Sequence, residues 1–183
     1  MTNTLAFFTV EPTKDNKGYL GAMLVTNDLG MPEEFRVTYP VKPTLLQRQL
    51  YGDSLMVHIG VTLCGLPLQK ALKTKPEIFL VSDRRFLPLA DEIQAPVVQI
   101  ERLGEAFAVG TDTDTSPLRK KIQSKSGRFQ PLSVLVPPAI DEARHQKSLS
   151  MLEKHFQTID LVEPFERIKG ALQALEAQDE RFR

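Results

Sequence analysis

The chain has little cysteine, no long hydrophobic run and no net charge. Cys64 is its single cysteine, which excludes an intramolecular disulfide and a cysteine-rich metal site and fits a reducing compartment. Acidic and basic residues balance at 23 each, so no overall field draws the chain to nucleic acid or to an anionic membrane. No apolar run approaches the roughly 18 residues of a membrane span, and the first residues lack the basic start of a signal peptide. We therefore expect a soluble, cytoplasmic protein without a membrane partner.

Several catalytic motifs are also absent. The sequence contains no phosphate-binding glycine loop, no nucleophile elbow and no kinase signature. His58, His145 and His155 lack the spacing of metal ligands, and we interpret them as surface or satisfied core residues. Cys64 lies within an apolar helical stretch and is interpreted as a buried structural thiol. None of these residues indicates an active site by itself.

Three strand-like segments open the chain. Leu5–Val10 is aromatic and β-branched, Gly18–Thr26 carries glycines that let another backbone approach closely, and Glu34–Tyr39 alternates apolar and polar residues. The Asn27–Gly30 turn joins the last two, because Asn, Asp and Gly tolerate turn conformations. These patterns predict three strands in antiparallel order.

A long apolar helical pattern follows, and then a strand, a helix and a strand. Thr44 is a plausible helix cap, and leucines from Leu45 onward recur at three- and four-residue steps. Glycines and Pro67 interrupt the pattern, so it is either two helices or one kinked helix. The strands predicted at Ile78–Val81 and Pro96–Ile100 flank a helix at 84–93, which implies a right-handed parallel crossover.

The second half of the chain is less regular. A polar loop at 111–116 precedes the basic run Arg119–Arg128, and Leu132–Val136 is either a strand or a buried arm. Helices are expected at 140–155 and from Pro164 onward. We divide the chain into a core (1–103), an irregular basic insertion or loop region (104–138) and C-terminal helices that pack on the core (139–183).

This order of elements resembles the ribonuclease H-like fold. That family carries an acid at the end of its first strand, a glycine-flanked second strand, a Glu on its first helix and an Asp at the end of its fourth strand. Here Val10-Glu11 ends the first strand, GYLGAMLV matches the second, and IFLVSD ends on Asp83. The resemblance covers about residues 5–101. It implies an α/β fold with a mixed five-stranded sheet, three antiparallel strands first, flanked by helices.

The resemblance also implies a chemistry. In this family two divalent cations, Mg²⁺ or Mn²⁺, sit between converging carboxylates and assist phosphodiester cleavage. Glu11 and Asp83 are the candidate metal ligands, and Asp141, with Glu142 beside it, is a candidate for a further catalytic acid. The helix that should supply a Glu offers Gln47 and Gln49, whose neutral oxygens do not offset metal charge. Asp53 lies one to two turns further along.

Each candidate also has a purely structural interpretation. Glu11 can be an ordinary strand end, Asp83 a cap neutralised by the two arginines that follow it, and Asp53 a solvated helix acid. The basic run is either a solvated loop or a phosphate-binding segment, with Phe129 available for base stacking. Its candidate nucleic-acid ligands are Arg119, Lys120, Lys121, Lys125 and Arg128.

Three functions remain open at this stage. The first is a non-catalytic ribonuclease H-like module with an incomplete carboxylate set, which binds a protein partner, a second copy or nucleic acid within a nucleic-acid-processing complex. The second is a metal-dependent nuclease. The third is a small regulatory or sensor domain of profilin-like fold, whose sheet would be antiparallel throughout. The pairing of Leu5–Val10 with Ile78–Val81 distinguishes the third from the others.

Overall fold

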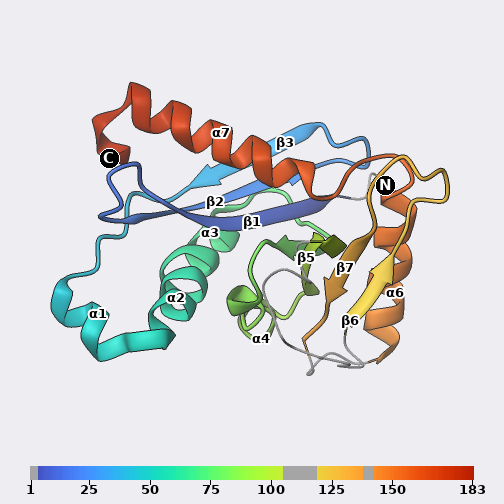
Figure 1. Ribbon diagram of the computed structural model, residues 1–183, viewed down its shortest axis with the longest axis horizontal. Helices are drawn as coiled ribbons and strands as arrows, with labels where there is room; N and C mark the ends of the chain where they lie inside the picture. Colours follow the sequence, from blue (N-terminus) through green and yellow to red (C-terminus); the bar gives the residue numbers. More distant parts are fainter. Residues whose placement is uncertain (1–3, 105–118, 138–141) are drawn as a thin grey trace.

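The protein is built on one seven-stranded sheet flanked by helices (Figure 1). The structure, a computed structural model, describes residues 4–104, 119–137 and 142–183. The strand order is β3-β2-β1-β4-β5-β7-β6. The strands are β1 (Leu5–Pro12), β2 (Tyr19–Thr26), β3 (Pro32–Val37), β4 (Ile78–Val81), β5 (Val97–Arg102), β6 (Arg119–Ile122) and β7 (Leu132–Leu135). The α/β class is confirmed, whereas the expected count of five strands is wrong.

The pairing directions confirm the predicted topology of the first five strands. β1 pairs antiparallel with β2, and β2 pairs antiparallel with β3. β4 then lies beside β1 in parallel, with Leu5 opposite Ile78 and Phe8 opposite Val81, and β5 continues in parallel. A profilin-like sheet would be antiparallel throughout, so the sensor-domain alternative is wrong for this fold.

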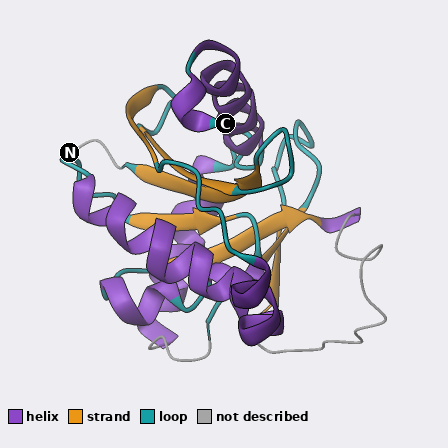
Figure 2. Cartoon of the chain, turned by 90° about the vertical axis from the view of Figure 1, so that its left-hand side faces the viewer, coloured by secondary structure: helices purple, strands orange, loops and turns teal. Residues whose placement is uncertain are grey.

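The sheet has a hydrophobic core on each face, because side chains alternate along its strands. Leu5 and Phe7 belong to the core under helices α6 (Glu142–His155) and α7 (Glu163–Gln178), where the ring of Phe7 meets that of Phe165 edge to face. We call this the α7 face. Ala6 and Phe8 belong to the opposite core, under the helices between β3 and β5. Helices lie on both sides of the sheet in Figures 1 and 2.

The long helical pattern forms a broken helix. It consists of α1 (Leu45–Tyr51), a 3₁₀ turn η1 (Gly52–Ser54), α2 (Leu55–Val57), a π-helical segment η2 (His58–Gly65) and α3 (Leu66–Ala71). Small residues let it lie close to the sheet: a Cβ added at Gly21 would lie 2.4 Å from the Cβ of Cys64. The predicted apolar stripe begins at Leu45, but α1 buries none of its residues.

The next helical segment is also broken. Instead of one helix at 84–93, the chain forms a 3₁₀ turn η3 (Arg84–Phe86) and then α4 (Leu89–Ile93). A further 3₁₀ turn, η4 (Glu180–Phe182), follows α7. None of the helices in the described ranges is long and apolar enough to cross a membrane.

The described part of residues 104–138 contributes two strands rather than only loops. Arg119–Ile122, expected within a basic loop, forms β6, and Leu132–Leu135 is a strand rather than an unpaired arm. β7 pairs antiparallel with both β5 and β6, and buries Leu132 and Val134 under α6. The basic segment therefore extends the sheet and forms one of its edges.

Candidate functional site

The ends of β1 and β4 carry a chain of hydrogen-bonded polar side chains. Ser82 Oγ donates to Thr9 Oγ1 at 2.7 Å, and Thr9 Oγ1 donates to Glu11 Oε1 at 2.9 Å. Thr9 is buried, whereas Ser82 and Glu11 are partly exposed. Thr9 and Glu11 continue the alternation of Leu5 and Phe7, so this cluster lies on the α7 face at the carboxyl end of the parallel pair.

The carboxylate of Asp83 is engaged by Arg85, two residues further along the chain. Its carboxylate accepts from Arg85 Nε at 3.0 Å and from the Arg85 guanidinium at 2.6 Å, and it also caps η3 by accepting from the Arg85 backbone N–H at 2.8 Å. Burial favours the neutral acid, but the bonds from Arg85 outweigh burial and hold the pKa of Asp83 below its usual value. These contacts agree with the structural interpretation of Asp83, in which it caps a helix and is neutralised by a neighbouring arginine.

Glu11 and Asp83 do not share one set of contacts, although their strands are neighbours. Asp83 continues the alternation of Phe79 and Val81, which point to the face opposite Glu11. Within the described ranges, no three His, Cys, Asp or Glu side chains are grouped so that they could hold a metal ion. The donor set at these strand ends, two hydroxyls and the carboxylate of Glu11, does not fit a pair of divalent cations. The catalytic and metal roles of Glu11 and Asp83 stay predictions.

The remaining carboxylate positions do not complete the set. Gln47 forms a capping box at the start of α1: its Oε1 accepts from the Thr44 N–H at 2.8 Å, and its N–H donates to Thr44 Oγ1 at 3.2 Å. Gln49 and Asp53 are exposed. Asp141 lies outside the described residues, so its predicted role is untouched by the structure.

The predicted nucleic-acid ligands lie on β6 and in the turn that follows it. Lys120, Lys121 and Lys125 are exposed, and the Arg128 guanidinium lies 5.2 Å from the centre of the Phe129 ring. Arg119 differs from the others, because it bonds Glu101 and Ser133, each at 2.7 Å.

The register of the sheet connects this edge with the strand ends. Followed from β4 through β5 and β7, the row of Ser82 ends at Lys120, on the same face. Three strand spacings separate the two residues, roughly 14 Å. The two residues between them in this row, Ile100 and Val134, are buried in the core of the α7 face, so covered core separates the hydroxyl pair from Lys120.

A second cationic group, which no pattern in the sequence indicated, lies near the end of β1. The Arg48 guanidinium lies 5.8 Å from the centre of the Tyr19 ring and donates to Tyr19 Oη and to the Lys17 carbonyl, both at 3.4 Å. Thr9 and Ser82 were also missed. The available signal was a polar residue at a position that the alternation of Leu5 and Phe7 marks as buried.

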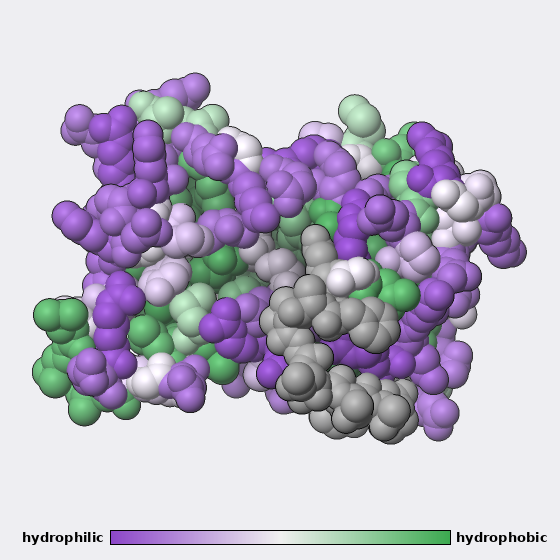
Figure 3. Space-filling model, in the orientation of Figure 1, coloured by the Kyte–Doolittle hydropathy of each residue, from purple (hydrophilic) through white to green (hydrophobic). Residues whose placement is uncertain are grey.

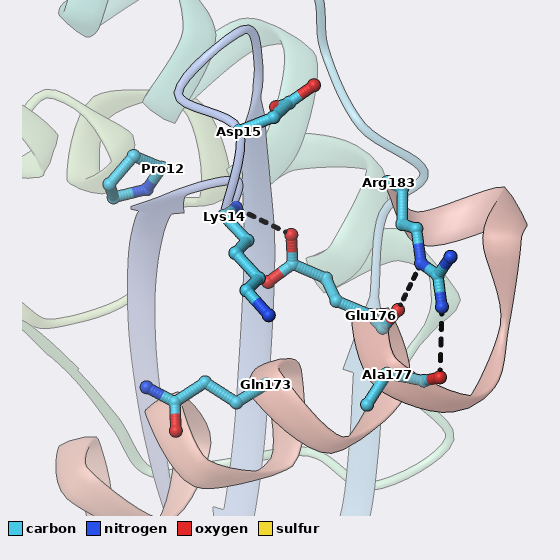
Figure 4. A pocket seen from close by; sticks show the side chains of 7 residues that line it. All are labelled: Pro12, Lys14, Asp15, Gln173, Glu176, Ala177 and Arg183. Atoms are coloured by element: carbon cyan, nitrogen blue, oxygen red, sulfur yellow. Dashed lines mark hydrogen bonds between the residues drawn. The ribbon is translucent and has the colours of Figure 1, made fainter.

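A cavity of about 800 Å³ lies beside the end of β1, between the β1–β2 hairpin and the end of α7 (Figure 4). The buried Glu176 accepts from the Lys14 backbone N–H at 2.8 Å. Arg183 donates to the carbonyls of Glu176 and Ala177, at 2.6 and 3.0 Å. Glu176 therefore holds α7 to the hairpin, and Arg183 holds the last residue of the chain to the end of α7.

The strand order and the parallel pairing of β1 with β4 define the class: this chain has the ribonuclease H-like fold. No family model matches the sequence, and no curated protein matches it. Among solved structures, Endonuclease V from Ciona intestinalis, in complex with a 24-mer DNA containing an inosine followed by a ribo-adenosine, is similar with a TM-score of 0.54. The identity is 15%, over 92% of this chain and 86% of that one.

Two further Endonuclease V structures are similar to the same extent. The enzyme from Streptomyces avermitilis has a TM-score of 0.53 at 13% identity, over 86% of this chain and 72% of that one. The catalytic domain of human Endonuclease V has a TM-score of 0.53 at 12% identity, over 94% of this chain and 85% of that one. At such identities the likeness establishes the fold, and function must be argued from the site.

Proposed function

We propose that this chain is a non-catalytic, nucleic-acid-binding module of ribonuclease H-like fold that acts as an accessory subunit in a nucleic-acid-processing complex. One observation carries the proposal: at the adjacent ends of β1 and β4 the side chains that meet are the hydroxyls of Thr9 and Ser82. Neutral hydroxyls do not offset the charge of two divalent cations. Among the described groups on that face, Glu11 is the carboxylate that joins them.

The binding part of the proposal rests on cations. Lys120 and Lys121 are exposed on an edge strand, and Lys120 shares the row of Ser82. Because the chain carries no net charge, phosphate contacts must come from such a local patch. The DNA in the Ciona Endonuclease V structure supports nucleic acid as the ligand of a similar fold.

Binding can be tested with matched charge changes. We expect Lys120→Glu/Lys121→Glu to weaken binding of labelled DNA or RNA, measured by fluorescence anisotropy. The slope of log K against log salt should fall in magnitude by about 1.4 to 1.8, since each of the two phosphate contacts contributes roughly 0.7–0.9. Lys70→Glu/Lys75→Glu is the control: it makes the same charge change on exposed residues in α3 and before β4. Equal loss in both variants would show that overall charge, not the β6 edge, governs binding.

A second candidate function is a divalent-metal-dependent nuclease. Its support is the similarity to three structures named Endonuclease V, together with Asp141, which lies outside the described residues. Glu11 and Asp83 would then contribute carboxylates, and Mg²⁺ or Mn²⁺ would supply the charge that assists phosphodiester cleavage.

Cleavage assays separate the two candidates. DNA, RNA and hybrid strands, with and without inosine, are incubated with Mg²⁺ or Mn²⁺ beside Glu11→Gln and Asp83→Asn variants. Cleavage that the variants lose would support the nuclease and refute a non-catalytic module. Equal background from all three proteins, with binding retained, is the result expected of the module.

A further inference from the structure

Helix α1 is oriented with its apolar side outward. Leu45, Leu46 and Leu50 have exposed fractions of 82%, 67% and 74%. Figure 1 shows α1 at one corner of the molecule, away from the sheet, and hydrophobic residues gather at that corner in Figure 3. A surface helix ordinarily turns its apolar side to the core, so this orientation is inverted.

The opposite side of α1 holds it in this orientation. At 100° per residue, Arg48 and Tyr51 lie roughly opposite the three leucines. Arg48 packs over the Tyr19 ring and bonds its hydroxyl, and the Tyr51 ring stacks on that of His58 with centres 4.7 Å apart. The Thr44 capping box fixes the start of the helix. The leucines are therefore presented outward by specific contacts rather than by a loose segment.

Such a helix gains little stability from contacts within its own chain. Isolated helices shorter than about 12 residues are marginal in water, and this one has 7 residues and buries none of them. Contiguous exposed apolar residues on a soluble protein mark an interaction surface. We call the residues Leu45, Leu46, Gln49 and Leu50 the leucine face.

We propose that the leucine face docks on the same face of a second copy of this chain. In a two-fold contact each residue meets the same patch, so a charged face would repel itself. The leucine face carries no charge, because Arg48, the one charged residue of α1, is turned back to Tyr19. Its polar member, Gln49, has an amide that both donates and accepts, and can therefore pair with its own copy.

The contact is small, which sets its expected strength. Seven residues at 1.5 Å each make α1 about 10 Å long. With the two helices antiparallel, Leu45 of one copy faces Leu50 of the other and Gln49 lies near the two-fold axis. An interface of this size is smaller than most specific ones, so we expect a weak dimer that forms only at the upper end of the concentrations tested.

Sedimentation velocity on the full chain, from about 1 μM to about 500 μM, tests this directly, because a dimer of this kind is concentration-dependent. We expect a shift from monomer to dimer in the wild type and a monomer throughout for Leu46→Glu/Leu50→Glu. Leu29→Glu/Met31→Glu is the matched control: it places two acids on residues that are 69% and 60% exposed, in the turn before β3. The control should dimerise like the wild type, and circular dichroism checks that each variant is folded.

A cross-link gives the position of the contact. Cys64 is buried, so Gln49→Cys introduces the accessible thiol, and a mild oxidant should join two copies through it. Ser150→Cys, exposed on α6, should not cross-link. A wild type that stays monomeric at every concentration overturns the proposal, even if it sediments with lipid vesicles or another protein. A dimer that survives Leu46→Glu/Leu50→Glu also overturns it.

Discussion

The hydroxyl chain at the strand ends makes a quantitative prediction for stability. Thr9→Val keeps the shape of a side chain that is 1% exposed and removes the hydroxyl that links Ser82 to Glu11. The lost hydrogen bond to a carboxylate contributes about 1.5–3 kcal/mol and the lost bond from Ser82 about 1 kcal/mol, so we expect the free energy of unfolding to fall by about 3 kcal/mol. Ser82→Ala removes a bond between neutral groups at a partly exposed site, which contributes about 1 kcal/mol.

The two changes should not be additive. Once Thr9 has lost its hydroxyl, the bond that Ser82→Ala removes is already gone, so the double variant should lose about 1 kcal/mol less than the sum. Urea unfolding followed by circular dichroism gives each value, provided that the m-value stays constant. Thr26→Val is the control, because the buried Thr26 hydroxyl has no hydrogen-bond partner among the described residues and its removal should be neutral or stabilising. Additivity within about 0.3 kcal/mol would refute the linked chain.

Three further predictions concern a carboxylate contact, two glycines and a charge change at the same strand ends. Burial opposes ionisation of Glu34, but bonds from the Thr74 and Lys73 N–H groups lower its pKa to about 2, below its ordinary value of 4.5. Its contribution, about 1–3 kcal/mol, is therefore present above pH 4.5 and lost as the pH falls toward 2, and Glu34→Gln should remove this part of the acid-unfolding curve. Gly21→Ala should cost about 1–3 kcal/mol in urea unfolding, because its Cβ would collide with a neighbour, whereas Gly170→Ala in α7 meets nothing within 4 Å and should stabilise by up to about 1 kcal/mol. Thr9→Asp/Ser82→Asp should unfold more easily without metal, because like charges meet, and regain about 2.7 kcal/mol at a Mg²⁺ concentration of 100 Kd, unlike the wild type.

The first five strands were predictable because their signals are local. Alternating apolar and polar residues, or apolar runs bounded by turn residues, identify β1 to β5. The acids at strand ends can be located because they stand where these runs end. β6 was missed because Ile122 is its one buried residue and three cations precede it. Lysines on an edge strand discourage pairing with other chains, but in sequence they look like a solvated loop.

The site was only partly predictable, because it depends on which face each side chain takes and on its partners. Glu11 lies near the end of β1 and Asp83 follows the neighbouring strand β4, yet the alternation gives them opposite faces and Arg85 engages Asp83. The outward leucines of α1 were likewise missed. The 3.6-residue period identifies an apolar stripe, but the packing of Arg48 on Tyr19 determines where that stripe points.

The close packing of Cys64 against Gly21 has a practical consequence for studies of this protein in solution. Burial raises the pKa of the Cys64 thiol to about 11, so in the native state neither the thiolate nor access for a reagent is available at neutral pH. Because Cys64 is the single cysteine of the chain, alkylation at neutral pH counts only those molecules in which η2 has lifted from the sheet. The rate of alkylation therefore reports how often this part of the core opens.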